Sequence, residues 1–460
     1  MIRTGRLAMT LGYGSMLAAA VALFVWIRTI GERLGGATTL HGYPPTIDAG
    51  APVNTIAHVL LALAVIIVTA RAMGVVFSWI HQPAVIGEIV GGIMLGPSLL
   101  GRIAPGAYAA LLPPQVAMFL GVYAQIGIMI YMFLVGLELD VRVLRKSGHA
   151  TIAISHASIV VPFLLGSALA IVLYPIVSPG DVPFTVFSLF LGVSLSVTAF
   201  PVLARILGDK NLQRTRMGTL ALTCAAVDDM TAWCLLALVV SIAHARTSQA
   251  LWAVMLTFAF IAVMFAAVQP VVRRWIASLD AASRMSKAGL SAMFAGLLTS
   301  AMATEYIGIH GIFGAFLFGA VMPHDSRAAV EINERLEDLV AVLFLPAFFA
   351  FTGMRTEIAL MSSARDWLIC GAIILVACAG KFGGTLVAAR LAGLQWRDSA
   401  ALGVLMNTRG LVELIALNIG LDLGIITHRL FTMLVVMALV TTFMTTPALN
   451  RMLRRRPWTA

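Results

Sequence analysis

The chain has 460 residues, of which 60% are hydrophobic and only 11% are charged, with a formal net charge of +10. Soluble domains carry about 25% charged residues, and so thin a charged shell cannot cover this much apolar surface in water. The composition excludes a disordered chain, a disulfide-rich secreted domain and a soluble enzyme with a tail anchor. It predicts an all-α polytopic membrane protein.

Apolar runs long enough to cross a bilayer recur along the whole chain. A spanning helix needs about 20 mostly apolar residues, and these runs do not alternate as the strands of a membrane barrel would. Fourteen runs can be read, near residues 9–27, 54–72, 83–100, 116–137, 151–174, 183–207, 217–243, 250–272, 288–306, 309–322, 339–353, 366–389, 398–420 and 430–449.

The basic residues give the sidedness of these runs. With the amino terminus inside, inside loops hold 22 basic residues, outside loops hold 7, and the spans hold 2, Lys381 and Arg409. Adding or removing one middle span would destroy this asymmetry, so the positive-inside rule supports the count and a cytoplasmic carboxyl terminus. The charge is spread over cytoplasmic loops rather than gathered in one patch, which excludes nucleic acid as a partner.

Residues 1–53 are predicted to form an amino-terminal helix, either an anchor or a signal, followed by an external loop. The basic start and the apolar stretch fit a signal peptide, but the stretch is long and no A-x-A site follows it. A retained helix is therefore favoured, and a cleaved signal stays the alternative.

Charged residues inside the spans are the main evidence for function. Each costs roughly 2.5–3.5 kcal/mol at the centre of a span. Asp228 and Asp229 lie in the middle of run 217–243, and no basic residue flanks them. Two acids are a costly way to pack a helix, so we predict that this pair binds ions rather than serving packing alone.

Lys381 is a lone base in the middle of run 366–389. A buried lysine without a partner loses its proton, whereas an aspartate beside it keeps it charged. We therefore predict a pair between Lys381 and Asp228. One lysine cannot neutralise two carboxylates, which leaves Asp229 freer to bind and release ions.

Arg409 and Glu413 have i, i+4 spacing on one helix face, which is typical of an intrahelical ion pair. A gating or ion-pathway role is the alternative interpretation. Glu88 lies nearer the cytoplasmic end of its run. It is either a partner for one of the charged spans or an acid of the vestibule, and the sequence does not separate these roles.

Two spans are predicted to be broken. Run 183–207 contains Thr198 and Pro201, and run 398–420 is interrupted by polar residues from Asn407 to Gly410. Broken helices at corresponding positions in two halves point to a transporter binding site, because freed carbonyls and helix ends face the ion. The domain at 54–449 then divides into an inverted pair of six-helix repeats, 54–243 and 288–449, joined by a linker helix at 250–272 and followed by a basic tail at 450–460.

Two further patterns favour packing or a surface position over chemistry. The glycines from Gly87 to Gly96 form overlapping GxxxG patterns, which permit close helix approach. The stretch AAVEINERLEDLVAVLFLP mixes acids and arginines before an apolar run, and we read it as a short cytoplasmic amphipathic helix.

Several blocks in order along 54–449 resemble the second monovalent cation:proton antiporter family. This family includes Kef-type potassium efflux systems, paired-aspartate sodium/proton antiporters and plant cation/H+ exchangers. The matching blocks are QPAVIGEIVGGIMLGPSLLG, FLVGLELD, SLSVTAFPVLARIL, AAVDDMTAW, GIHGIFGAFLFGAVMP, LEDLVAVLFLPAFFAFTGMRTEI and MNTRGLVELIALNIG.

The resemblance implies a thirteen-helix antiporter core with inverted repeats, two crossed broken helices, a dimerisation domain and a moving core domain. It also implies that Asp228 and Asp229 bind the cation and protons in turn, that Lys381 pairs with the first aspartate, and that Thr198 lies at the first helix break. The amino-terminal helix is extra to this pattern. The Kef regulatory domain has no counterpart before Ala460, so glutathione-type gating is not expected.

The sequence thus predicts a secondary antiporter, not an enzyme, that exchanges Na+ or K+ for protons, with two protons per cation and hence net charge movement. No cofactor is expected beyond the transported ions. We expect a homodimer in the lipid bilayer of the plasma (inner) membrane. The alternatives are a cation channel, a Kef-like efflux protein without its regulatory domain, and, more remotely, an intramembrane aspartyl protease.

Overall fold

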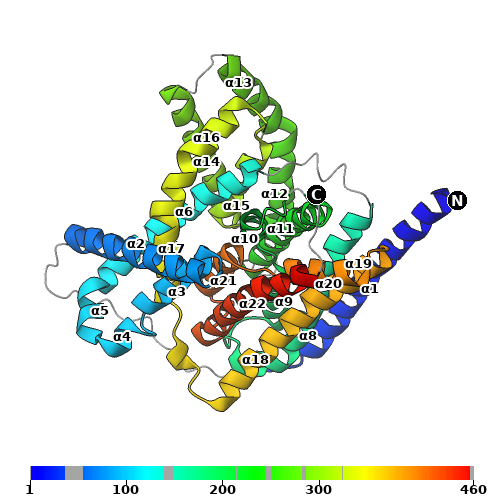
Figure 1. Cartoon of the computed structure of the whole chain (residues 1–460), viewed down its shortest axis with the longest axis horizontal. Coiled ribbons are helices and arrows are strands. Elements are labelled where there is room, and N and C mark those ends of the chain that lie inside the picture. The colour runs from blue at the N-terminus through cyan, green and yellow to red at the C-terminus, as the bar shows by residue number, and fades with distance from the viewer. Residues whose placement is uncertain are drawn as a thin grey trace.

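The computed structural model describes residues 2–36, 55–138, 149–213, 215–244, 250–281, 286–323 and 325–455, and all regular structure in these ranges is helical (Figure 1). Within these described ranges, eleven helices are long and apolar enough to cross a membrane, or twelve if one bent pair counts as a single span. The predicted runs at 288–306 and 309–322 are also helical. The second of these is only 11 residues long, Gly311–Val321.

The first half of the chain alternates long helices with short ones. Its helices are α1 (Ile2–Gly31), α2 (Thr55–Trp79), α3 (Ala84–Leu95), α4 (Leu100–Ile103), α5 (Pro105–Leu111), α6 (Pro114–Glu138), α8 (His149–Val177), α9 (Phe184–Ser196), α10 (Phe200–Asp209) and α11 (Arg216–His244).

The second half contains three π-turns and one 3-10 turn between its α-helices. The elements are α12 (Ala250–Val263), η1 (Met264–Val268), α13 (Gln269–Ala281), α14 (Lys287–Ile307), α15 (Gly311–Val321), α16 (Arg327–Leu339), η2 (Val340–Phe344), α17 (Leu345–Met354), η3 (Ile358–Leu360), α18 (Ala364–Cys378), η4 (Ala379–Gly383), α19 (Gly384–Leu391), α20 (Trp396–Met406), α21 (Leu411–Asp422) and α22 (His428–Arg455). The last helix runs on into the region predicted as a tail.

Helix packing divides the molecule into two groups. The first group contains α2, α3, α6 and α12 to α17, and the second contains α8 to α11 and α18 to α22. Extensive packing links helices within each group. Between the groups, close backbone approach is limited mainly to α11 against α12 and to α22 against α3 and η3, although side chains of both groups share one apolar cluster, in which Trp233 contacts Phe313 and Phe316. In Figure 1 the first group lies at the left and top, and the second lies at the centre and right.

The extra amino-terminal helix α1 packs on the second group, against α8 and α9. The ring of Phe184 lies where a side chain on Gly31 would be, so the helix approaches α9 closely at this point. Just beyond the helix end, the Glu32 carboxylate accepts hydrogen bonds from Arg28 Nε at 2.7 Å and from Thr185 Oγ1 at 2.9 Å.

The predicted short amphipathic helix is instead the first part of a long one. Helix α16 continues through the π-turn η2 directly into α17, so that 327–354 forms one continuous helical stretch. Its apolar residues Ala328, Ala329, Ile332 and Leu336 are buried, while the opposite face is polar. The sequence pattern located the amphipathic part, but it did not indicate that this helix continues into the span.

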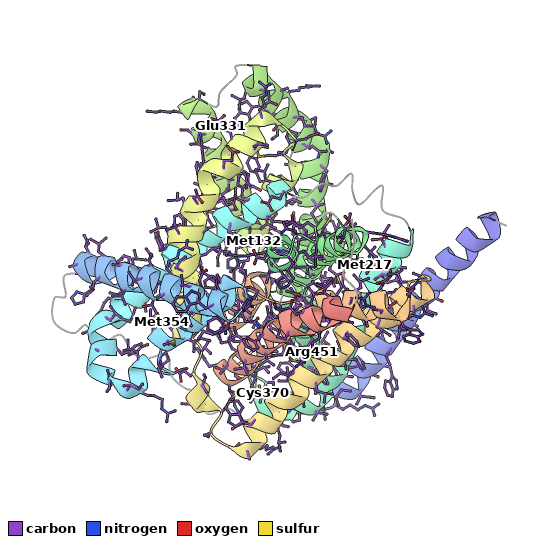
Figure 2. All side chains as sticks on the ribbon, in the orientation of Figure 1. Met132, Met217, Glu331, Met354, Cys370 and Arg451 are labelled. Carbon is purple, nitrogen blue, oxygen red and sulfur yellow. The ribbon has the colours of Figure 1, made fainter. Side chains whose placement is uncertain are left out.

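The glycines of α3 allow backbones to touch, as the GxxxG patterns predicted. A Cβ atom on Gly92 would lie 2.2 Å from the carbonyl oxygen of Phe349, and one on Gly353 would lie 2.1 Å from the carbonyl carbon of Gly92. Helices α3 and α17 therefore approach so closely that neither position tolerates a side chain without a backbone shift. Met132, fully buried on α6, lies near the centre of the molecule in Figure 2, whereas Glu331 of α16 lies at the upper edge.

A single methyl group at Gly92 tests this contact. We expect Gly92→Ala to lower the free energy of unfolding by about 1–3 kcal/mol, because the added methyl overpacks the interface. Gly371→Ala in α18 is the matched control, since no atom lies within 4 Å of the added methyl. It should be neutral or stabilising, because alanine favours a helix by about 1 kcal/mol. Thermal unfolding in detergent measures both; equal Tm values for the two variants would contradict the packing argument.

Candidate functional site

Two interrupted helices meet in the middle of the second group. Helix α9 ends at Ser196 and α10 begins at Phe200, while α20 ends at Met406 and α21 begins at Leu411 with a bend of 45°. The extended segments between them are hydrogen-bonded to one another, with the amide of Ala199 donating to the carbonyl of Thr408 at 3.0 Å. Both predicted breaks are confirmed, and four helix ends converge at this crossing.

Asp228 is fully buried on α11 and its carboxylate faces this crossing. Lys381 Nζ lies 2.8 Å from Asp228 Oδ2, and Thr198 Oγ1 donates to the same oxygen at 2.9 Å. Ser155 Oγ donates to Oδ1 at 2.5 Å, and Ser158 Oγ donates a further hydrogen bond to Oδ2. The structure thus surrounds this acid with one cation and three hydroxyls, which satisfies a buried charge.

Lys381 reaches Asp228 from a π-turn that interrupts the helix formed by α18 and α19. The turn, Ala379–Gly383, lies against α8, and a Cβ atom on Gly380 would be only 2.7 Å from the Cα atom of Pro162. π-Turns are rare and are frequent at functional sites. Lys381 itself is fully buried.

Asp229 has a different environment from its neighbour. Consecutive residues of a helix point about 100° apart, so the two carboxylates leave α11 in different directions. Asp229 is buried, with 4% of its surface exposed, and its Oδ1 has no hydrogen-bond partner among the described residues. A buried carboxylate oxygen without a donor is costly, and it invites a proton or a cation.

A cavity of about 440 Å³ lies between the two groups. Tyr131 on α6 lines it and is in electrostatic reach of Asp229, which is not itself among the lining residues. Glu138, Arg205 and Glu337 also line this cavity. The cavity therefore approaches Asp229 at Tyr131 but does not reach the carboxylate.

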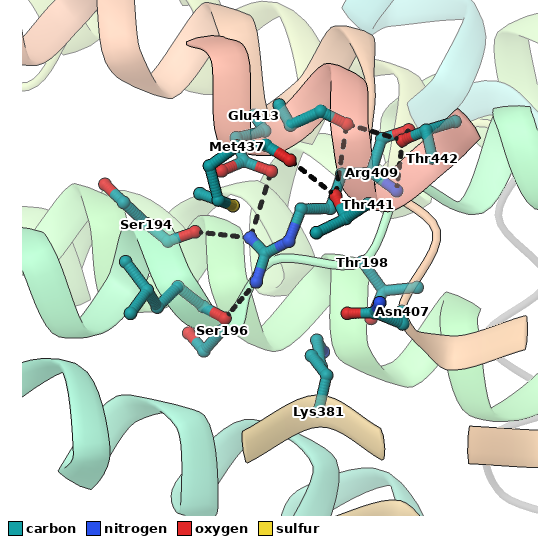
Figure 3. Close-up of polar contacts among 12 residues, drawn as sticks. Ser194, Ser196, Thr198, Lys381, Asn407, Arg409, Glu413, Met437, Thr441 and Thr442 are labelled. Atoms are coloured by element: carbon teal, nitrogen blue, oxygen red, sulfur yellow. Dashed lines mark hydrogen bonds and ion pairs between the residues drawn. The ribbon is translucent and has the colours of Figure 1, made fainter. Parts of the chain in front are cut away.

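Arg409 and Glu413 form a fully buried ion pair, with 3.0 Å between Arg409 Nη1 and Glu413 Oε2 (Figure 3). Arg409 lies in the break before α21 and Glu413 lies on α21, so the prediction of an intrahelical pair is wrong because the helix is interrupted between α20 and α21. The guanidinium also donates to the carbonyls of Ser194, at 2.8 Å, and Leu195. These carbonyls end α9, where the helix dipole is negative, while Glu413 lies in the first turn of α21, where it is positive. The Arg409–Glu413 pair therefore offsets the partial charges of two helix ends at the crossing.

A side chain of α22 forms hydrogen bonds with backbone groups that the second helix break leaves unpaired. Thr442 Oγ1 donates to the carbonyl of Arg409 at 2.8 Å and accepts from its amide at 3.0 Å. Asn407 Nδ2 donates to Cys378 Sγ at 3.5 Å, and Asn407 Oδ1 has no partner among the described residues. In Figure 3 Asn407 lies beside Thr198, and Lys381 approaches from the side opposite Glu413.

Glu88 is not a partner of either charged span, and that interpretation is wrong. It lies 3.7 Å from Arg71 Nη1, on the neighbouring helix α2 of the same group. Its neighbour Val85 lines the 440 Å³ cavity, whereas Glu88 itself is not among the lining residues. The sequence could not choose among these partners, because α2 and α3 approach through glycine contacts that spacing alone does not specify.

Ser155 and Ser158 are the residues of this site that the sequence reasoning missed. Both are buried on α8 and both contact Asp228. Their i, i+3 spacing places them on one face of the span at 151–174, and this is the signal that could have found them. Serines also serve packing in membrane helices, so the spacing gains meaning only once α8 is known to lie beside α11.

The described residues contain no group of three or more His, Cys, Asp or Glu side chains that could hold a metal ion. A carboxylate oxygen such as Asp229 Oδ1 is a hard ligand of the kind that suits small cations.

Comparison with known proteins gives one consistent family. Residues 60–455 match the family described as "Sodium/hydrogen exchanger, transmembrane". The Na+/H+ antiporter NhaS4 of Synechocystis is 41% identical over 86% of this chain and 97% of its own length. The K+/H+ antiporter 1 of Saccharomyces cerevisiae is 35% identical over 91% of this chain but only 48% of its own length.

Plant relatives give the same picture. The Cation/H+ antiporter 20 of Arabidopsis thaliana is 40% identical over 84% of this chain, which spans about half of that protein. The solved sodium proton antiporter MjNhaP1 of Methanocaldococcus jannaschii has a TM-score of 0.55 over 87% of this chain, at 13% identity, and supports the fold. All these relatives are transporters, which sets aside the aspartyl protease alternative.

A double-mutant cycle tests the pairing of Lys381 with Asp228. We expect Lys381→Met to lower the free energy of unfolding by about 3–5 kcal/mol, because it leaves a buried carboxylate without its cation. Asp228→Asn combined with Lys381→Met should cost less than the sum of the two single changes. Lys287→Met, at the exposed start of α14, serves as the control and should change little. Additive single effects in thermal unfolding would show that the two side chains are not coupled.

Proposed function

Because the chain belongs to the sodium/hydrogen exchanger family of cation/proton antiporters, we propose that it exchanges Na+ or K+ for protons at Asp228 and Asp229. The observation that carries this proposal is the unequal surroundings of two adjacent acids. Asp228 is held by Lys381 and three hydroxyls, whereas Asp229 Oδ1 has no donor among the described residues.

The asymmetry supports a division of labour between the two acids. Asp228 with Lys381 forms a fixed, satisfied pair that holds α11 against the helix crossing. Asp229 is the carboxylate that alternates between a proton and a cation, since either one relieves the cost of leaving it unpaired. Competition for one carboxylate couples the two flows, because the cation can enter only after the proton has left.

Alternating access follows from the division into two groups. The few close backbone contacts between the groups permit the second group to move as a unit past the first, carrying both aspartates. Arg205 lines the 440 Å³ cavity, and Arg71 donates to the carbonyl of Ala341 in its wall. Both arginines were counted on the inside by the positive-inside rule, which assigns that end to the cytoplasm. On this assignment the structure is the inward-open state.

The relatives support Na+ and K+ as the cations to test. One relative is named a Na+/H+ antiporter and another a K+/H+ antiporter, and oxygen donors accept both ions. Titration of proton release with Na+, K+ and Li+ in one vesicle preparation distinguishes them.

A homodimer in the plasma (inner) membrane fits the surface of the first group. Large apolar side chains of α12 and α14 are exposed there, including Trp252, Phe258 and Tyr306. Lipid or a second copy would cover them. Light scattering in detergent tests this assembly, and a monomer mass would contradict it.

Removing the free acid should abolish exchange. We expect Asp229→Ala to eliminate the release of protons when cation is added to everted vesicles, because no group then binds proton and cation in turn. Asp181→Asn, in an exposed loop, is the matched control and should retain full exchange. Proton release that is unchanged in Asp229→Ala would rule out this carboxylate as the transport site.

Exchange of two protons for one cation requires a second proton site besides Asp229, and in this proposal the Asp228–Lys381 pair carries that proton. Such exchange moves one net charge, which is worth about 2.3 kcal/mol for each 100 mV of membrane potential. We therefore expect an imposed potential of 100 mV in proteoliposomes to shift the equilibrium ion ratio about 50-fold. An electrically silent exchange would reject this stoichiometry while leaving antiport itself in place.

A further inference from the structure

Polar contacts join the two helix groups at the end of the bundle opposite the 440 Å³ cavity. Four of them link the end of α17 and the residues after it to α21 and α22: Arg355 with Asp422, Arg355 with Asn418, Thr352 with Asn418, and the Glu357 amide with Thr432. The Arg355–Asp422 contact is an ion pair that bridges the two groups, whereas the cluster of side chains that the groups share is apolar.

Arg355 is the centre of this cluster. Its Nη2 lies 2.6 Å from Asp422 Oδ1, and its Nη1 donates to Asn418 Oδ1 at 3.1 Å. The guanidinium also lies 4.2 Å from the centre of the Phe351 ring, in a cation–π contact that fixes its direction. Asn418 Nδ2 in turn donates to Thr352 Oγ1 at 2.9 Å, so that each partner is held from both sides.

The space between the groups is nearly closed beside this cluster. A pocket lined by Gln125, His310, Asn418 and Asp422 has a volume of about 20 Å³, enough for one water molecule. The cavity at the other end has about 440 Å³. Glu337, on the wall of that cavity, lies in the helical stretch 327–354, and Arg355 follows the end of this stretch directly. The two residues are 18 positions apart, which corresponds to about 27 Å along the helix axis.

We propose that Arg355 is the latch of the outer gate and that it releases cation-binding oxygens when the gate opens. In the inward-open state the guanidinium holds α21 against α17 and occupies the oxygens of Asn418 and Asp422. When the second group moves, these contacts break, and the two side chains line the outer mouth with oxygen donors suited to a monovalent cation. This inference rests on the proposed exchange function.

A second ion pair at the same end differs from that of Arg355, because it does not join the two groups. Arg429 pairs with Asp366, but both residues belong to the second group, on α22 and α18. Movement of one group past the other leaves that pair intact. Loss of Arg429 is therefore the matched control for loss of Arg355, because it removes an arginine ion pair that does not bridge the groups.

The first measurement detects how accessible the outer pocket is to a labelling reagent, and it does not depend on transport. In a background with Cys224, Cys234, Cys370 and Cys378 changed to Ser, a single Ala124→Cys, at a buried position on the wall of the outer pocket, reports on its opening. We expect Arg355→Gln to speed the labelling of this cysteine by a membrane-impermeant maleimide from the outer side at least threefold. The reason is that loss of the latch makes the state with a closed outer gate less populated. Arg429→Gln should leave the labelling rate unchanged.

The second measurement uses the native cysteines and the two membrane orientations. The ratio of outer to inner KM for the cation should fall at least threefold in Arg355→Gln, because a bias between states changes apparent affinity oppositely on the two sides. The charge swap Arg355→Asp with Asp422→Arg should move the ratio back toward that of the parent protein. A purely structural loss would change expression or Tm and leave this ratio in place.

Unchanged labelling and an unchanged KM ratio in Arg355→Gln would overturn the latch, as would equal changes in Arg429→Gln. Failure of the proposed function gives a different result. If the parent protein shows no exchange while Arg355→Gln still speeds labelling, the latch stands and the transport proposal falls.

Discussion

A carboxylate in the middle of a membrane is stable only where the protein supplies its partners, and the arrangement around Asp228 meets this requirement. A lysine and three hydroxyls from three other spans, α8, the break after α9 and the π-turn before α19, converge on it. Each of these elements is irregular or polar where an ordinary spanning helix would be apolar. The rest of the site follows from them, because they fix α11 and thereby direct Asp229 away from the same donors.

The helix crossing needs its own electrostatic compensation. Two helices that end in mid-membrane leave unsatisfied carbonyls and amides, and no water is present there to bond them. Arg409 binds the carbonyls at the end of α9, Glu413 lies at the start of α21, and Thr442 bonds both backbone groups of Arg409. The interrupted helices can thus stay rigid, which would keep the aspartates in place during the proposed movement of the second group.

The two groups differ in how they are built, and the difference explains the proposed motion. Within the first group, glycines bring α3 against α17 until their backbones touch, which makes a close-packed frame. Between the groups, close backbone contacts are few, and the polar contacts described above gather at the end opposite the 440 Å³ cavity. A protein that must expose one acid pair to two sides in turn needs this contrast, because packed interfaces switch between discrete arrangements rather than bending continuously.

The sequence alone determined those features that depend on composition and local spacing. The shortage of charge predicted membrane spans, the basic loops predicted their sidedness, and the cost of charge in the bilayer singled out Asp228, Asp229 and Lys381. Proline and polar residues within apolar runs also located both helix breaks. Only the tertiary structure decided which residues meet. It identified Ser155 and Ser158, paired Glu88 with Arg71, and placed Arg355 between the groups. The reason is physical: hydropathy and helical period act along one segment, whereas a partner is chosen by the packing of segments far apart in the chain.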